Sequence, residues 1–411
     1  MNVYGIVILT ALGIDLFLTW LADYLNLGAL RPELPKGAEG FYDPESYRRS
    51  QEYTRAQTLF GYVTSCFGLV VLLAFWFGGG FNRLDLWLRG LGFGPVATGL
   101  IFIGALVVAK GLLDLPFRIY GTFVLEERFG FNRTRPSTFA GDLVKGVAVT
   151  AVLGAPILAL VLYFFEQVGP SAWIYCWLLT TVFTLFFQLI FPTWILPLFN
   201  KFEPLQEGEL RTALERYSER VGFHLTGIFV MDGSKRSSKS NAFFTGLGKS
   251  KRIALFDTLI ESHGVDELVA VLAHEVGHYR RGHIPKMLAL GIAHNGILFF
   301  LMSIFLSHRG LFDAFFMDEM SVYAGLVFFG LLYSPIEMLL TFAIHAVQRR
   351  HEFEADAFAA ETTGDADAMA NALEKLSATN LSNLTPHPLF VALNYSHPPV
   401  LHRIAAIRAR A

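Results

Sequence analysis

Apolar stretches of membrane length recur along the chain and are separated by segments rich in charged residues. The first stretch, Val3–Ala22, has no lysine or arginine before it and no clear small-residue cleavage site. We therefore interpret it as a membrane helix rather than a cleaved signal peptide. Six more stretches of about 20 residues, the length of a transmembrane helix, follow at 57–79, 97–117, 143–166, 171–192, 285–306 and 322–344. The pattern predicts a mainly α, multi-pass membrane protein with about seven transmembrane helices.

Two polar regions interrupt this pattern. Residues 193–284 are predicted to form an insert with two helices and three strands, at 207–222, 258–283, 227–231, 239–244 and 251–256. A turn-rich segment, 245–250, joins the last two strands. The second polar region, 345–411, is predicted to be helical with a Pro-rich break at Thr385–Pro399.

The order of these regions predicts a division of the chain. Residues 1–192 form an N-terminal membrane region with spans one to five. Residues 193–411 form a second region that holds a small β-sheet and includes spans six and seven. Since these two spans separate the polar segments in sequence, the segments must meet in space to form one unit.

Lysine and arginine are distributed unevenly among the loops between the predicted spans. The segments after spans one, three, five and seven carry basic clusters, whereas the other loops carry Arg83, Arg89 and Arg309. Because basic loops stay on the cytoplasmic side, we expect the amino terminus outside and the carboxyl terminus in the cytosol. The membrane is then the endoplasmic reticulum in a eukaryote, or the inner or plasma membrane in a prokaryote.

Composition supports a membrane protein and excludes some functions. Hydrophobic residues make up 53% of the 411 residues and charged residues 17%, which is too apolar for an ordinary soluble enzyme. The formal net charge of −2 argues against nucleic-acid binding. Cys66 and Cys176 both lie in apolar stretches, which argues against a disulfide framework or a zinc-thiolate site.

Candidate chemistry is concentrated in His274-Glu275-Val276-Gly277-His278. Two histidines four residues apart lie on one face of a helix, so both can bind one metal ion, and zinc suits them best. Glu275 then projects beside the metal and can take a proton from a water molecule there. The alternative is two unrelated core histidines, but a chance match to this pattern arises in about one such chain in a hundred.

A hydrolytic zinc site needs a third protein ligand and a position open to water. Predicted span seven returns the chain to the side of the His-Glu-x-x-His helix. Five candidates follow it: His345, His351, Glu352, Glu354 and Asp356. Glu352 and Asp356 are one helical turn apart, which suits a ligand and a carboxylate that holds a histidine ligand. Glu354 has Phe358 at the matching position. Spacing thus favours Glu352, while an acidic helix start stabilised by the helix dipole is the alternative.

Six motifs in this order resemble those of the type I CAAX prenyl proteases, which are seven-span zinc metallopeptidases of the gluzincin kind. The motifs are Glu126–Asn132, Leu196–Phe202, Ser240–Phe243, His274–His278, Glu352–Asp356 and Tyr395–Pro399. The resemblance covers nearly the whole chain. It implies one zinc ion per chain with His274, His278 and Glu352 as ligands, and Glu275 as the general base.

The resemblance also implies roles for residues around the metal. Asp356 matches the carboxylate that supports a ligand, and His397 matches a histidine that helps to bind the substrate carbonyl in the transition state. Asn241, with Ala242, matches a substrate-facing strand, and Arg403 a buried arginine near the site. The other histidines are interpreted as structural: His224, His263, His283, His294, His308, His345, His387 and His402.

The function predicted from these observations is a zinc endopeptidase at the cytosolic membrane face that removes the C-terminal tripeptide of prenylated CAAX-type substrates. Its partners would be membrane lipid and a peptide or protein, with or without a prenyl group. Alternatives are a quality-control protease for unprenylated peptides, a site-2-type intramembrane protease, and a non-enzymatic transporter or scaffold. The sequence leaves the oligomeric state open.

Overall fold

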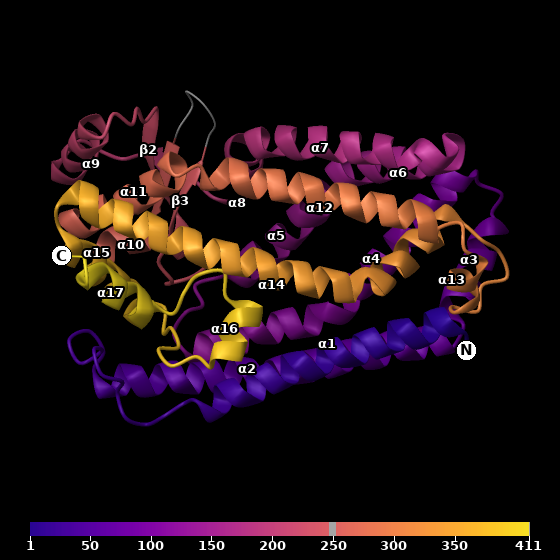
Figure 1. The fold of residues 1–411 in the computed structure, drawn as a ribbon, viewed down its shortest axis with the longest axis horizontal. Coiled ribbons are helices and arrows are strands. Elements are labelled where there is room, and N and C mark those ends of the chain that lie inside the picture. The colour runs from indigo at the N-terminus through magenta and orange to yellow at the C-terminus, as the bar shows by residue number, and fades with distance from the viewer. Residues whose placement is uncertain (246–251, 411) are drawn as a thin grey trace.

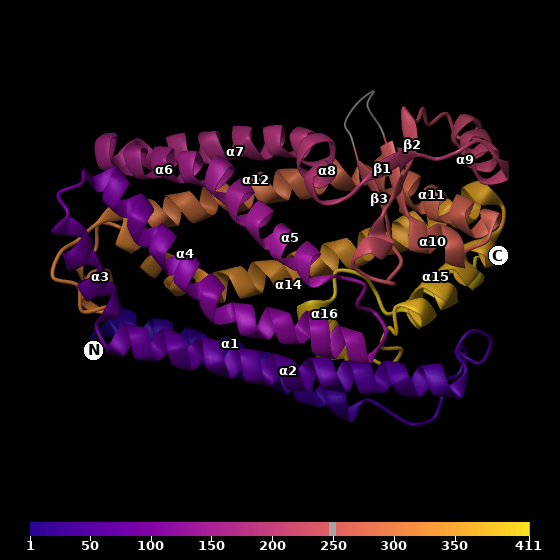
Figure 2. The same cartoon turned by 180° about the vertical axis from the view of Figure 1, so that it is seen from behind.

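The computed structural model describes residues 1–245 and 252–410. In this part of the chain, long helices run along the longest axis of the molecule, and a small sheet with short helices is gathered at one end (Figure 1). The amino terminus lies at the opposite end (Figure 1 and Figure 2). Seven helical segments of the described residues are long and apolar enough to cross a membrane. The predicted mainly α, multi-pass architecture is therefore confirmed.

All seven predicted spans match a helical segment. The segments are α1 (Val3–Gly28), α2 (Pro44–Phe77), α4 and η1 (Pro95–Tyr120, Gly121–Glu126), α5, η2 and α6 (Pro136–Val149, Thr150–Gly154, Ala155–Gln167), η3, α7, η4 and α8 (Gly169–Ser171, Ala172–Ile190, Phe191–Ile195, Leu196–Phe199), α12 (His283–Phe305) and α14 (Val322–Thr363). Short helices α3 (Gly80–Arg89) and α13 (Arg309–Asp313) cover the end near the amino terminus.

Two of these helices are much longer than predicted, and both extensions are polar. Helix α2 begins at Pro44 rather than near residue 57, because the carboxylate of Asp43 caps it by accepting hydrogen bonds from the backbone N–H groups of Glu45 and Ser46. Helix α14 continues past the apolar span to Thr363. The polar segment with Glu352 is therefore a continuation of span seven and not the start of a new helix.

Within the described residues, the sheet has four strands in the order β1-β2-β4-β3. The strands are β1 (Phe202–Pro204), β2 (Gly227–Met231), β3 (Ala242–Thr245) and β4 (Arg252–Phe256). β2 and β4 are parallel, and the outer strands pair antiparallel with them. The three predicted strands are present within a few residues, and β1 was not predicted because it has only three residues. The turn expected at 245–250 lies almost wholly outside the described residues.

The prediction of one continuous helix at 258–283 in the insert is wrong. It is broken into α10 (Asp257–Ser262) and α11 (Val265–Arg280). Gly264 has an extended backbone, and the side chain of Glu267 accepts a hydrogen bond from its N–H at 2.7 Å, which starts a new helix. Gly282, at φ +68°, separates α11 from α12. The other predicted helix, at 207–222, is α9 (Glu209–Arg220).

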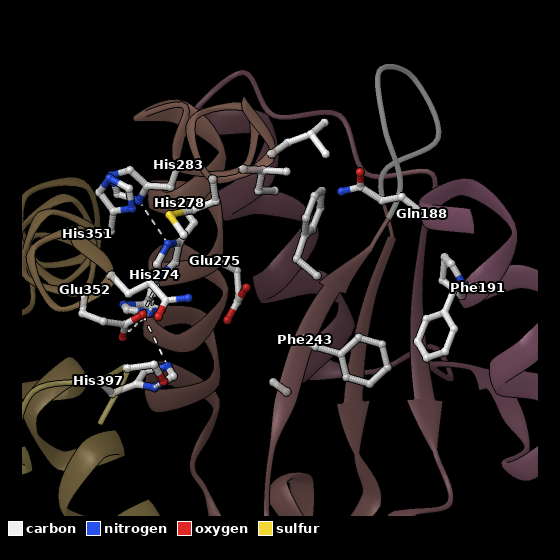
Figure 3. A pocket seen from close by; sticks show the side chains of 18 of the residues that line it. Gln188, Phe191, Phe243, His274, Glu275, His278, His283, His351, Glu352 and His397 are labelled. Atoms are coloured by element: carbon white, nitrogen blue, oxygen red, sulfur yellow. Dashed lines mark hydrogen bonds and ion pairs between the residues drawn. The ribbon is translucent and has the colours of Figure 1, made fainter. Parts of the chain in front are cut away.

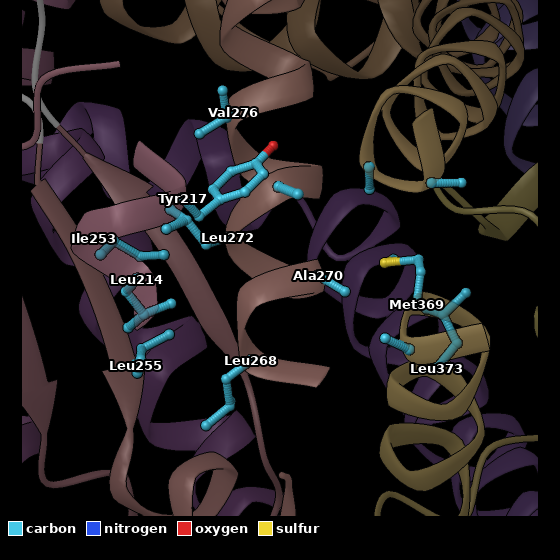
Figure 4. Packing of buried hydrophobic residues seen from close by; sticks show 14 of the residues in the cluster. Leu214, Tyr217, Ile253, Leu255, Leu268, Ala270, Leu272, Val276, Met369 and Leu373 are labelled. Atoms are coloured by element: carbon cyan, nitrogen blue, oxygen red, sulfur yellow. The ribbon is translucent and has the colours of Figure 1, made fainter. Parts of the chain in front are cut away.

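Helix α11 lies at the centre of the polar end of the molecule (Figure 4). Leu268, Leu272 and Val276 pack with residues of the sheet and α9, while Ala270 faces Met369 and Leu373 of α15. The remaining helices there are α15 (Ala366–Thr379), α16 (Pro388–Asn394) and α17 (Val400–Arg408), and a one-turn segment, η5 (Gly233–Lys235), follows β2. Since each fully buried leucine contributes about 1.5–3 kcal/mol, this core holds α11 rigidly.

Candidate active site

The His-Glu-x-x-His motif lies in the C-terminal half of α11 and faces α14, where Glu352 lies. The two helices approach closely because α11 has glycine at position 277: a Cβ there would lie 3.1 Å from the Cα atom of Ala355. His274 and Glu352 are buried, and His278 is partly exposed. The two polar regions of the chain thus meet in space at this site, as expected (Figure 3).

Three side chains direct one ligand atom each toward a common point. The Nε2 atoms of His274 and His278 are 3.1 Å apart. Carboxylate oxygens of Glu352 lie 3.5 Å from His274 Nε2 and 3.3 Å from His278 Nε2. Tetrahedral zinc with bonds of about 2.0–2.1 Å separates its ligand atoms by about 3.3 Å. The three residues therefore fit a metal ion of this size.

A buried carboxylate and a buried arginine support His274 and Glu352. Asp356 Oδ1 lies 2.9 Å from His274 Nδ1, which keeps the ring proton on Nδ1 and leaves Nε2 free for a metal. Arg403, on α17, donates to both oxygens of Asp356 at 2.7 and 2.8 Å. Its Nη1 atom also lies 3.3 Å from Glu352. Asp356 and Arg403 were both expected near the site, and the structure brings them together there.

Glu275 faces a cavity of about 840 Å³ between α11 and strand β3 (Figure 3). Desolvation by burial raises the pKa of its carboxyl group, and the neighbouring histidines oppose this shift. A base with a raised pKa accepts a proton more readily near neutral pH. The cavity continues from Glu275 along apolar residues of the membrane spans: Phe187, Phe191, Leu196, Ile284, Met287 and Leu288.

His397 approaches the same point from the loop between α16 and α17. Its Nε2 atom lies 3.4 Å from Glu352, and its Nδ1 atom lies 2.9 Å from the hydroxyl of Ser396. Its side chain borders the cavity beside Glu352, across from Phe243 (Figure 3). Although 63% of its side chain is accessible, partial desolvation beside the cavity lowers the pKa of the imidazole, which favours the neutral ring with one N–H to donate.

The strand expected to face a substrate is β3, an edge strand of the sheet. Ala242 and Phe243 line the cavity, whereas Asn241 lies just before the strand and is not among the lining residues. The Asn241 carbonyl accepts a hydrogen bond from Phe256 at 3.1 Å, and its side chain accepts one from Ala242 at 2.8 Å. These bonds hold the start of β3 beside the cavity.

Sequence reasoning missed two residues beside the candidate metal ligands. His283, interpreted as structural because it is off the His274/His278 face, lies with Nδ1 3.0 Å from His278 Nδ1. The Nε2 atom of His283 lies 3.1 Å from Glu354, the acidic residue for which spacing showed no partner. The left-handed backbone at Gly282 ends α11 and places His283, the first residue of α12, beside His278, and a glycine just after the helix was the only sequence signal for it.

Comparison with known proteins agrees with this architecture. Residues 23–201 match the family described as CAAX prenyl protease N-terminal, five membrane helices, and residues 204–411 match peptidase family M48. CAAX prenyl protease 1 of Saccharomyces cerevisiae is 35% identical, over 91% of this chain and 88% of the yeast protein. The Arabidopsis thaliana CAAX prenyl protease 1 homolog is 36% identical, over 95% of this chain and 94% of its own length.

A solved structure shares the whole fold. The crystal structure of S. mikatae Ste24p superposes with a TM-score of 0.93 at 33% sequence identity, covering 99% of both chains. The transporter, scaffold and site-2-type alternatives are therefore wrong, whereas the division of the chain at 192 stays a prediction. The chain is a multi-pass membrane metallopeptidase that belongs to the CAAX prenyl protease 1 family of M48 peptidases.

Proposed function

We propose that this protein binds one zinc ion through His274, His278 and Glu352 and hydrolyses peptide bonds near the carboxyl terminus of prenylated substrates. The convergence of three ligand atoms beside a base that is not a ligand carries this proposal. A structural zinc site usually has four protein ligands and needs no base. Here a carboxylate, Glu275, faces the cavity instead.

The protein residues divide the work of hydrolysis among them. When bound, zinc polarises the scissile carbonyl and makes a water molecule at the site more acidic. Glu275 takes a proton from that water and delivers it to the leaving amine. His397, which lies beside Glu352 at the edge of the cavity, donates a hydrogen bond to the developing oxyanion, an effect of about 3 kcal/mol in comparable sites.

The substrate binds along strand β3, just after Asn241. An extended peptide adds to an edge strand through main-chain hydrogen bonds, which makes recognition permissive in sequence. Ala242 contributes a small side chain where this edge borders the cavity, so a peptide can approach the backbone closely. Asn241 acts by holding the start of the strand rather than by lining the cavity.

The apolar part of the cavity accommodates a prenyl chain on the substrate. From the site, the cavity extends between helices α7, α12 and α14. On α14 it reaches Gln348, where the polar extension of that helix starts. Relatives at 30–36% identity carry the name CAAX prenyl protease 1. With about 0.8 kcal/mol for each buried methylene, a prenyl chain supplies much of the binding energy. The basic loops support a position of this site on the cytosolic face of the membrane.

One experiment tests both chemistry and substrate. Purified protein is incubated with a farnesylated CAAX peptide and with its unprenylated twin, and the zinc content is measured in parallel. We expect Glu275→Gln to retain about one zinc ion per chain and lose peptidase activity, and His278→Ala to lose both. Turnover by Glu275→Gln at the wild-type rate would refute the mechanism. Equal turnover of the two peptides would favour quality control of unprenylated substrates instead.

A further inference from the structure

A chain of hydrogen-bonding side chains extends from His278 away from the metal-facing atoms. His278 Nδ1 and His283 Nδ1 are 3.0 Å apart, and His283 Nε2 is 3.1 Å from Glu354 Oε2. The other oxygen of Glu354 accepts a hydrogen bond from Arg350 at 2.9 Å. His278 thus has a supporting group on the side opposite the ligand set (Figure 3).

The positions of the ring protons in this chain follow from the geometry. Nε2 of His278 faces His274 and Glu352, so this nitrogen is the one available to a metal and carries no proton. The proton of His278 is then on Nδ1, which donates to His283 Nδ1. His283 must therefore carry its own proton on Nε2, which donates to the Glu354 carboxylate. Each bond in the chain has one donor and one acceptor.

The surroundings of His283 hold its ring in this orientation. Its side chain is buried, with 3% exposed, and the ring of His351 stacks on it at a centroid distance of 3.9 Å and an interplanar angle of 10°. Stacking fixes the plane of the ring, and burial excludes water from both nitrogens. Both ring nitrogens of His283 have a partner, as a buried imidazole requires, and one of these partners is the candidate ligand His278.

We infer that His283 and Glu354 are positioning residues that hold His278 in the tautomer and orientation required of a metal ligand. Asp356 supports His274 directly, and Glu354 supports His278 through His283. Both carboxylates lie on α14, the helix that also carries Glu352. This inference rests on the proposed function, because it takes His278 Nε2 as a ligand atom.

The test uses full-length, zinc-loaded protein in detergent and measures how fast zinc is lost to a chelator. Loss of a group that supports a ligand weakens metal binding by about 10–100-fold. We therefore expect zinc to dissociate about tenfold faster from His283→Leu and faster than wild type from Glu354→Ala. His283→Gln, which keeps one acceptor and one donor, should be intermediate. Glu361→Ala is the matched control, since Glu361 is also on α14 but exposed, with 61% of its side chain accessible.

A second readout separates positioning from loss of folding. Cobalt replaces zinc, and its visible absorption reports the ligand geometry. We expect an altered spectrum in His283→Leu and lower kcat at unchanged KM, with thermal unfolding of the metal-free protein close to that of wild type. If His283→Leu does not fold, Glu354→Ala carries the same test, since Glu354 is partly exposed.

The outcomes distinguish the two proposals. Wild-type protein that binds no zinc, or a His278→Ala variant that keeps it, would overturn the proposed function and this inference with it. If His278→Ala loses zinc but His283→Leu and Glu354→Ala match wild type in dissociation rate and cobalt spectrum, the positioning role is refuted while the ligand set stands.

Discussion

Replacing Gly277 with alanine should disable the metal site while leaving the fold intact. Helices α11 and α14 approach each other closely at Gly277. This contact lies near the histidine pair on α11 and Glu352 on α14. An added Cβ would lie 3.1 Å from both the Cα atom and the carbonyl oxygen of Ala355, and 3.2 Å from Cβ of Phe358. Two of these three neighbours are backbone atoms, which cannot rotate away. The helices must therefore separate.

The required separation can be compared with the tolerance of the site. Carbon atoms in favourable contact lie about 3.5–4.0 Å apart, so α14 must move by about 0.4 Å or more relative to α11. Metal–ligand distances tolerate only about 0.2 Å. For folding, the cost of overpacking is about 1–3 kcal/mol, and alanine recovers about 1 kcal/mol of helix propensity. The free energy of unfolding thus falls by about 0–2 kcal/mol, which a folded protein survives.

The assay measures zinc content after equilibration with graded chelator, peptidase activity, and thermal unfolding of Gly277→Ala. We expect zinc affinity to fall at least about tenfold, as it does when the groups that orient metal ligands are lost in other proteins. Activity should fall in proportion. Gly291→Ala on α12 and Gly330→Ala on α14 are controls, because a Cβ at either position meets nothing within 4 Å. Wild-type zinc affinity and kcat in Gly277→Ala would refute the argument that this close approach sets the ligand geometry.

Four further predictions concern charge, substrate and topology. Arg403→Leu removes the charged partner of the buried Asp356 carboxylate and leaves it only the His274 ring, so unfolding in detergent should show a loss of about 3–5 kcal/mol, and Arg403→Lys should lose less. Because burial raises the folded-state pKa of Glu275, its ionisation costs stability as pH rises through that pKa. Glu275→Gln should therefore raise the Tm of metal-free protein at pH 7.5, and the gain should vanish at pH 4; a gain independent of pH would contradict this. Steady-state kinetics should show that prenylation lowers KM more than it raises kcat, since the lipid binds ground and transition states alike. With both native cysteines replaced, a cysteine at Ser237 should be labelled only from the cytosolic side and one at Gly310 only from the other; reversed labelling would overturn the orientation.

The sequence alone determined those elements that depend only on residues close to one another along the chain. A span needs only about 20 apolar residues in a row, so all seven spans were predictable, although their polar extensions in α2 and α14 were not. Two histidines four residues apart face one direction on any helix, so the pairing of His274 and His278 beside Glu275 required no tertiary information. The ends of α11 were not predicted, because Gly264 has an extended backbone that other residues also adopt, and a glycine at 282 does not by itself reveal its left-handed conformation.

Tertiary structure alone decided which distant groups meet the motif. Glu352 and Asp356 face α11 because α14 continues as one helix past the membrane, and spacing within that helix only favoured them over their neighbours. Glu354 is two residues from Glu352 and so points about 200° away around the helix, where sequence offered it no partner. The break between helices at Gly282 supplies that partner, His283, at the start of α12. Such contacts depend on how helices far apart in sequence pack against each other, which no local pattern of residues records.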